Sequence, residues 1–260
     1  MTVSHCTGIL PISRETGVRP TDDVTACRRT DRTTDGEGPP LQTLIETLQF
    51  IAGNLGFIGA ATLEHISLVA VAVGLAVVTG VPIGIAITQN RAVADVVLYV
   101  ASIIITIPSI ALFGLMIPLL SQIGQGIGYL PAVIAVLLYS QLPIIRNTYT
   151  AINNVDPALR EAASGMGMKP MQRLARVEIP LAVPVIMAGV RTAVVMNIGV
   201  MAIAAYIGAG GLGTLISRGI AQTDSRQLIA GALAVSLLAI VADYALLWLQ
   251  RRLTPEGLRT

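Results

Sequence analysis

Two ionisable residues, Arg191 and Asp243, lie well inside long apolar runs of this sequence. Arg191 follows Pro180 and Asp243 precedes Arg251 at similar separations, so the two side chains should lie at similar depths if both runs cross a membrane. Charged groups inside such runs usually pair or face a water-filled interior. We predict that Arg191 and Asp243 form an ion pair or share one polar pocket, and we favour a structural pairing over a direct functional role.

Two other groups of residues resemble a phosphate-binding loop and a metal or proton site, but they lack residues that such sites need. Residues 208–213 are rich in glycine, like a phosphate-binding loop, yet no Lys-Ser/Thr pair follows and no strand precedes them, so we expect a tight re-entrant turn. Glu64-His65 stands at the start of an apolar run, where interfacial solvation is more ordinary than a metal or proton site. We expect no catalytic, cofactor-binding or metal-binding residue in this chain.

The composition is that of a membrane protein. Hydrophobic residues make up 53% of the 260 residues and charged residues 12%, whereas soluble proteins have about 25% charged residues. A net charge of +2 is too small to indicate a nucleic-acid partner. Cys6 and Cys27 have no metal-ligand spacing, so we expect free thiols, with a disulfide as the alternative if this segment is exported.

Apolar runs long enough to cross a bilayer, which needs about 20 residues, indicate an all-α polytopic bundle of five spans. The expected spans cover residues 66–88, 96–120, 129–150, 181–207 and 227–250, the second bent by Pro108 and Pro118. Residues 41–63 carry polar interruptions that favour an interfacial helix, with a sixth span as the alternative. Residues 1–40 are expected to be a disordered or mis-assigned extension, residues 64–252 the membrane domain, and residues 253–260 a cytoplasmic tail.

Basic residues in short loops predict the orientation of the spans. If the charged segment 151–179 is cytoplasmic, most basic residues of the membrane domain and the tail share its side, whereas the loop 121–128 on the other side carries no charge. The basic residues meant are Arg91, Arg146, Arg160, Lys169, Arg173, Arg176, Arg251, Arg252 and Arg259. Five spans would then leave the N-terminus outside.

Segment 151–179 is predicted to begin with a short helix. Asp156-Pro157 is a strong helix start, since aspartate caps free amide groups and proline already has a helical φ. Ala162 and Ala163 have small side chains that would let another surface approach closely. Gly165 and Gly167 permit a sharp stop, because glycine accepts positive φ.

A second short helix is expected from Lys169-Pro170 to Glu178, closed by Pro180. The two short helices would form an elbow that projects from two membrane spans. An ordinary cytoplasmic loop is the alternative interpretation.

These residues resemble the EAA signature of inner-membrane permeases of binding-protein-dependent ABC importers. That signature is Glu-Ala-Ala, three residues, Gly, nine residues, Ile, one residue, Leu-Pro. Here Glu161-Ala162-Ala163 and Gly167 match and the nine-residue spacing is kept, while Val177 and Ile179 replace the isoleucine and the leucine. The resemblance covers about residues 64–258 and leaves residues 1–40 outside.

The resemblance implies the fold of a type I ABC importer permease, embedded in the lipid of a bacterial cytoplasmic membrane. In that family the elbow inserts into a groove on a separate ATPase, and no ATPase motif occurs in this chain, which is therefore not expected to be an enzyme. The residues expected to couple to the ATPase are Asp156, Arg160, Glu161, Ala162, Ala163, Gly165, Gly167 and Pro180. Those expected to line the translocation path or its gate are Arg191, Tyr206, Gly210, Gly211 and Asp243.

The implied partners are cytoplasmic ABC ATPase subunits, a second permease of the same or a different sequence, and an extracytoplasmic substrate-binding protein. Residues 147–152, 155–157, 184–193 and 205–213 look like those of osmoprotectant permeases, which handle glycine betaine, carnitine, choline or proline betaine. A methionine or sulfonate permease is the alternative. A secondary transporter, which would show more spans and an internal repeat, and a non-transporting scaffold are favoured less.

Aromatic residues are scarce, with one Trp, three Phe and six Tyr. Quaternary ammonium ligands are commonly held in aromatic cages, and this chain does not favour such a cage. We therefore expect the affinity for substrate to come from the separate binding protein, with a low-affinity passage in this chain.

Overall fold

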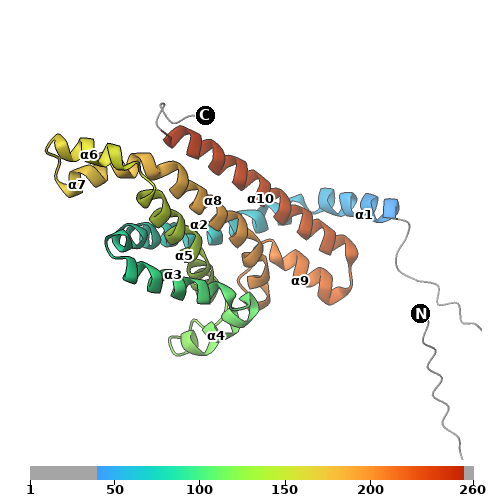
Figure 1. Cartoon of the computed structure of the whole chain (residues 1–260). Helices are drawn as coiled ribbons and strands as arrows, with labels where there is room; N and C mark the ends of the chain where they lie inside the picture. The colour runs from blue at the N-terminus through green and yellow to red at the C-terminus, as the bar shows by residue number, and fades with distance from the viewer. Residues whose placement is uncertain (1–39, 255–260) are drawn as a thin grey trace, which may run out of the picture. The chain divides into compact units, whose positions relative to one another are not determined.

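The computed structural model describes residues 40–254, and every regular element in that range is a helix (Figure 1). The four long helices are α2 (Leu55–Ala86), α5 (Tyr129–Asn153), α8 (Ile179–Ile203) and α10 (Ser225–Leu253). The others are α1 (Pro40–Gly53), η1 (Ile87–Gln89), α3 (Arg91–Thr106), α4 (Ser109–Ser121), α6 (Pro157–Gly165), α7 (Pro170–Arg173), η2 (Leu174–Glu178), η3 (Ala204–Ile207) and α9 (Gly213–Gln222). The predictions for residues 1–39 and 255–260, including both cysteines, lie outside the described residues.

Helix α5 lies at the centre of the bundle and packs against α2 and α8. Glycines allow this close approach, because small residues bring helix backbones together in membranes. A Cβ atom on Gly84 of α2 would lie 2.6 Å from Cβ of Thr148 in α5. A Cβ atom on Gly189 of α8 would lie 2.7 Å from the carbonyl oxygen of Pro143 in α5. The glycines of α2 and α8 therefore determine how closely these two helices pack against α5.

Four helical stretches are long and apolar enough to cross a membrane: Leu55–Gln89, Tyr129–Asn153, Pro170–Ile207 and Ser225–Leu253. A fifth span exists if α3 and α4 count as one broken span. The predicted all-α bundle of about five spans is thus confirmed, and the spans predicted at 129–150 and 227–250 lie within a few residues of α5 and α10.

The predicted second span, residues 96–120, is two helices, α3 and α4, which meet at 99°. The break falls at Ile107-Pro108, where Ile107 takes an extended φ and ψ, as residues before proline prefer. The hydroxyl of Tyr139 in α5 donates a hydrogen bond to the freed carbonyl oxygen of Ile107. Pro118 lies inside α4 and does not break it.

The first span begins earlier than the predicted residue 66. A single break at Asn54 separates α1 from α2, and α2 runs without interruption from Leu55. Residues 41–63 therefore do not form one separate interfacial helix, because the polar residues in the stretch do not stop the helix after Asn54. Thr62, for example, donates its hydroxyl to the carbonyl oxygen of Ile58 one turn earlier, at 2.7 Å.

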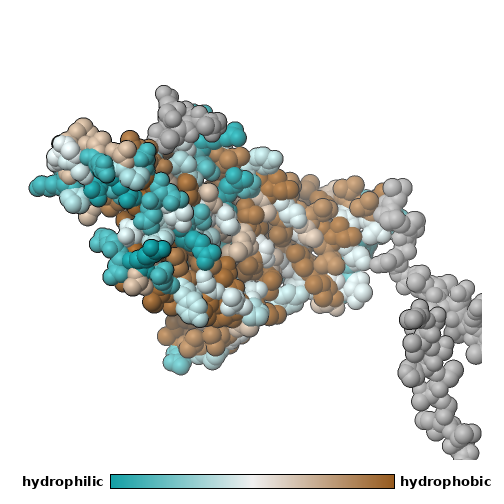
Figure 2. Space-filling model, viewed as in Figure 1, coloured by the Kyte–Doolittle hydropathy of each residue, from teal (hydrophilic) through white to brown (hydrophobic). Residues whose placement is uncertain are grey.

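The visible surface of the described helices separates by polarity (Figure 2). Hydrophobic side chains cover the long helices, and hydrophilic side chains gather at the end of the bundle that carries α6 and α7. Large exposed apolar side chains such as Leu237, Ile240 and Val241 on α10 are consistent with a lipid or protein environment in place of water.

Candidate functional site

Helices α6 and α7 form a compact elbow at one end of the bundle, between α5 and α8 (Figure 1). The side chain of Asp156 accepts a hydrogen bond from the backbone N–H of Ala158 at 2.9 Å, with Pro157 as the first helical residue. Gly167 has φ of +79° and ends the α6 turn. The helix start predicted at Asp156 and the positive φ predicted at Gly167 are therefore confirmed, whereas Gly165 is the last residue of α6.

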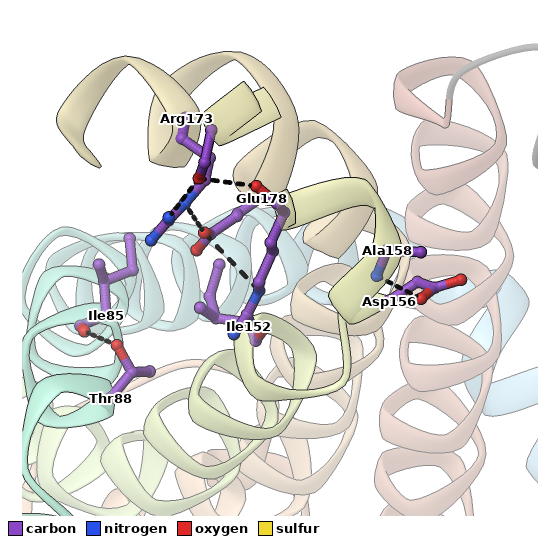
Figure 3. A network of polar contacts seen from close by, with 9 residues as sticks. Ile85, Thr88, Ile152, Asp156, Ala158, Arg173 and Glu178 are labelled. Carbon is purple, nitrogen blue, oxygen red and sulfur yellow. Dashed lines mark hydrogen bonds and ion pairs between the residues drawn. The ribbon is translucent and has the colours of Figure 1, made fainter. Parts of the chain in front are cut away.

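One buried carboxylate joins the parts of the elbow (Figure 3). The side chain of Glu178 is 7% exposed, and its Oε1 accepts a hydrogen bond from Nε of Arg173 at 2.8 Å. The same oxygen lies 3.7 Å from Nε of Arg160 in α6. Arg160 also donates to the carbonyl oxygen of Ile152 in α5, and Arg173 donates to Oγ of Ser164 at 3.1 Å. We call Glu178, Arg173 and Arg160 the elbow clamp.

The second half of the elbow continues into the membrane span. After α7 the chain makes a π-helical turn over η2 and enters α8 at Ile179 without a break. Pro180 was predicted to close the second helix, but it does not: it lies in the first turn of α8, directly after the π-helical turn, and the helix runs through it. A helix that is continuous from Pro170 to Ile207 can transmit a push from the elbow into the bundle.

The two alanines of the signature face opposite ways. Ala163 is 2% exposed and packs inside the elbow, whereas Ala162 and Glu161 are exposed. The exposed face also carries Leu159 and Met166, at 45% and 71% exposure. We call Leu159, Glu161, Ala162 and Met166 the outer face of α6. Apolar side chains exposed on a hydrophilic end of the molecule are typical of a protein-binding surface.

Arg191 and Asp243 form the predicted ion pair. Nη2 of Arg191 lies 2.7 Å from Oδ2 of Asp243, and Nε donates to Oδ1. The two side chains come from α8 and α10, and they are 33% and 30% exposed. They line an open pocket of about 430 Å³ with Ala188, Thr192, Val195 and Met196.

The glycine-rich turn is held by the two residues that were expected only to be solvated. Gly208, Gly210 and Gly211 all have positive φ, as a tight turn requires. Oε2 of Glu64 accepts a hydrogen bond from the N–H of Gly211 at 2.8 Å. His65 is fully buried, and its Nε2 lies 3.1 Å from the carbonyl oxygen of Ile198. The prediction of interfacial solvation is wrong for His65, which is buried against α8 and the turn. Glu64 is exposed, as expected, but it also bonds the turn.

The five residues predicted for a path or gate fall into two groups. Arg191 and Asp243 pair with each other, while Gly210 and Gly211 lie in the turn beyond η3. Tyr206 belongs to η3 and is 54% exposed. Tyr206 lies fifteen positions after Arg191 along the helix, roughly 20 Å at about 1.5 Å per residue, so the two groups occupy different depths.

Sequence reasoning missed Glu178 and Arg173, which hold the elbow together. Their charges next to apolar runs were visible in the sequence. Charge alone, however, does not show which carboxylate is buried or which arginine it binds. Among the residues that the structure describes, no group of three or more His, Cys, Asp or Glu side chains could hold a metal ion.

Comparison with known proteins agrees with this geometry. Residues 80–255 match the family model described as binding-protein-dependent transport system inner membrane component. The chain is 59% identical over 215 residues to the osmoprotectant import permease protein OsmW of Salmonella typhimurium, covering 83% of this chain and all of that protein. It is 40% identical to the glycine betaine/carnitine/choline transport system permease protein OpuCB of Bacillus subtilis, covering 82% of this chain and 96% of that protein.

The fold is similar to that of solved ABC importer permeases. The inward-facing MetNI methionine ABC transporter matches with a TM-score of 0.68 at 24% identity, over 74% of this chain and 94% of that one. An amino acid ABC transporter matches with a TM-score of 0.63 at 22% identity, over 83% of this chain and 99% of that one. The EAA-like elbow, the bundle of apolar helices and these likenesses agree, and the chain belongs to the family of binding-protein-dependent transport system inner membrane components.

Proposed function

We propose that this chain is the permease subunit of an ATP-driven importer of osmoprotectants such as glycine betaine, carnitine, choline and proline betaine. The support is the family membership together with the functions for which relatives that are 40–59% identical are named. ATP hydrolysis would belong to a separate cytoplasmic ATPase, and a substrate-binding protein outside the membrane would deliver the substrate.

The structure of the elbow supports the proposal that it couples this chain to the ATPase. Its outer face presents the exposed side chains of Leu159, Glu161, Ala162 and Met166. The elbow clamp fixes this face to the helix that becomes α8. A rigid element pushed by an ATPase moves the span behind it, whereas a flexible loop would absorb the motion.

The passage itself would form between two permeases. A chain with four or five candidate spans supplies half of a bundle, so a second copy or a related chain completes it. Arg191 and Asp243 would line the passage, and Tyr206, Gly210 and Gly211 its outer gate. Lipid would surround the remaining apolar faces, and residues 253–260 would form a short cytoplasmic tail.

Uptake into proteoliposomes tests this proposal. The permease would be assembled with its ATPase and binding protein, with ATP inside the vesicles and labelled glycine betaine, choline, carnitine or methionine outside. We expect ATP-dependent uptake of at least one osmoprotectant and none of methionine. Uptake of methionine alone, or uptake that does not require ATP, would reject the proposal.

Glu161→Lys tests the elbow in the same vesicles. Reversing the charge on the outer face should abolish ATP-dependent uptake while the protein remains inserted in the membrane. Arg176→Gln, which removes an exposed charge elsewhere in the elbow, is the matched control and should transport normally. Unchanged uptake by Glu161→Lys would sink the coupling proposal.

A further inference from the structure

The ion pair between Arg191 and Asp243 is placed where a charged pair is costly. Helix α8 runs from Ile179 to Ile203, so Arg191 is its middle residue. Asp243 lies inside α10, away from both ends of that helix. About a third of each charged side chain remains exposed on the surface of the single chain. Since ionisable groups in spans face a protein interior or a water-filled cavity and not lipid, this face belongs to a passage.

The pocket around the pair has a composition that suits one class of molecule. Its walls hold one cation, one anion and the hydroxyl-bearing Thr192, and the remaining lining is the apolar surface of Ala188, Val195 and Met196. The volume of about 430 Å³ is within the range of about 300–1,000 Å³ that small-molecule sites occupy. None of the lining residues is aromatic, so a cation here would be recognised by charge and not by a ring.

We propose that the Arg191–Asp243 pocket is a transient binding site for a zwitterion whose carboxylate takes the place of Asp243 on the guanidinium of Arg191. The inference rests on the proposed function and names the substrate class of the passage. The fork of Nε and Nη2 that now bonds Asp243 is the geometry that binds a free carboxylate through two hydrogen bonds. The released carboxylate of Asp243 then faces the quaternary ammonium, whose methyl groups pack on Val195 and Met196.

Charge balance decides which osmoprotectants fit. Arg191 and Asp243 together are neutral, so a zwitterion leaves both charges paired. A cation such as choline can pair with Asp243, but it leaves Arg191 with no partner inside a span, where an unpaired charge is costly. The pocket therefore prefers glycine betaine or carnitine to choline. Because the substrate must displace an existing ion pair, its binding is weak, as a site that must also release its substrate requires.

Saturation-transfer NMR on the purified permease in lipid nanodiscs measures such weak binding without the ATPase or the binding protein. The probes are glycine betaine, choline and sucrose, the last as a ligand with no charge. We expect transfer to the methyl protons of glycine betaine, a signal for choline weaker by about tenfold at equal concentration, and none for sucrose.

Two variants and one control assign the signal to the pocket. Arg191→Gln removes the partner of the substrate carboxylate and should reduce the betaine signal about tenfold. The choline signal should rise in this variant, because Asp243 is no longer paired with Arg191, whereas Asp243→Asn should reduce both signals. Arg226→Gln, which removes an arginine from the exposed pair with Asp224 at the start of α10, should change neither. Circular dichroism and size-exclusion chromatography check that each variant is folded.

The outcomes separate this inference from the proposed function. The proposed binding site is overturned if the wild-type chain gives no betaine signal, or if the double variant Arg191→Gln/Asp243→Asn retains that signal. Either result would stand even if the assembled transporter imports osmoprotectants. A betaine signal that both variants lose supports the pocket, whichever partner subunits prove to complete the transporter.

Discussion

The guanidinium of Arg173, the residue before a π-helical turn, donates a hydrogen bond of 2.8 Å to the carboxylate of Glu178, the last residue of that turn. The two residues are five positions apart, the spacing that a π-helical turn brings together, and Nε of Arg160 in α6 lies 3.7 Å from the same oxygen. π-Helical turns are rare and occur mostly near functional sites. Here the turn is the point at which the elbow becomes the span.

Glu178→Gln should loosen the elbow without unfolding the bundle. The variant keeps the side-chain volume but removes the charge that holds Arg173 and Arg160, for a loss of about 1–2 kcal/mol, because both arginines are about a third exposed. We expect faster amide hydrogen exchange in residues 157–178 and more ATP hydrolysed per substrate imported. Exchange and coupling equal to those of the control Arg176→Gln would show that the clamp does not rigidify the elbow.

Gly211→Ala should destabilise the turn after α8. Gly211 has φ of +72°, and a Cβ there would lie 2.9 Å from Nδ1 of His65. The strained backbone costs about 1–3 kcal/mol, which a lower midpoint of thermal unfolding in detergent would report. Gly199→Ala is the control, since its Cβ would meet no atom within 4 Å and alanine favours the helix by up to about 1 kcal/mol. Equal midpoints for the two variants would contradict this explanation.

Gly84→Ala should separate α2 from α5. The added Cβ would lie 2.6 Å from Cβ of Thr148, so the two helices must move apart, at about 1–3 kcal/mol for an overpacked contact. Gly74→Ala, on the same helix but with open space around it, should not lower stability and, by helix propensity, should raise it by up to about 1 kcal/mol. Chemical denaturation in mixed micelles compares the two, and a Gly84→Ala variant as stable as the control would refute the close approach.

Ser140→Ala should weaken the contact between α5 and α8. Asn197 donates to Oγ of Ser140 at 2.8 Å, and both side chains are fully buried. Hydrogen bonds between membrane helices contribute about 0.6–1.7 kcal/mol, and we expect a loss in this range. A double-mutant cycle with Asn197→Ala measures the coupling energy, which should be clearly different from zero; strictly additive losses would show that the pair contributes nothing.

The local features of this protein could be predicted from its sequence. Asp156-Pro157 begins a helix and Gly167 takes a positive φ because those preferences act within a few residues. The lengths of α5 and α10 follow from apolar runs that end at polar residues. The pairing of Arg191 with Asp243 could also be inferred, because few ionisable groups inside spans leave few choices of partner.

Features that depend on distant partners could not be predicted. Glu64 bonds Gly211 across 147 positions of sequence, and nothing near Glu64 indicates that contact. Pro108 predicted a bend, but the angle of 99° between α3 and α4 depends on how both helices pack. Pro180 was expected to close a helix, since proline has that effect in a helix interior, but the helix runs through it directly after a π-helical turn, which the sequence does not indicate.

Contact between the outer face of α6 and the ATPase is the central claim, and site-specific cross-linking measures it most directly. The two cysteines of the chain, Cys6 and Cys27, would be replaced by serine, and Ala162→Cys or Gln125→Cys introduced. Ala162 is exposed on α6, and Gln125 is exposed in the loop after α4. A short reagent that bonds the introduced thiol at one end and carries a photoactivated group at the other, applied to the assembled transporter and illuminated, should join the Ala162→Cys permease to the ATPase and leave Gln125→Cys unlinked. An ATPase adduct with Gln125→Cys, or none with Ala162→Cys in an assembled complex, would contradict the proposed coupling through the elbow.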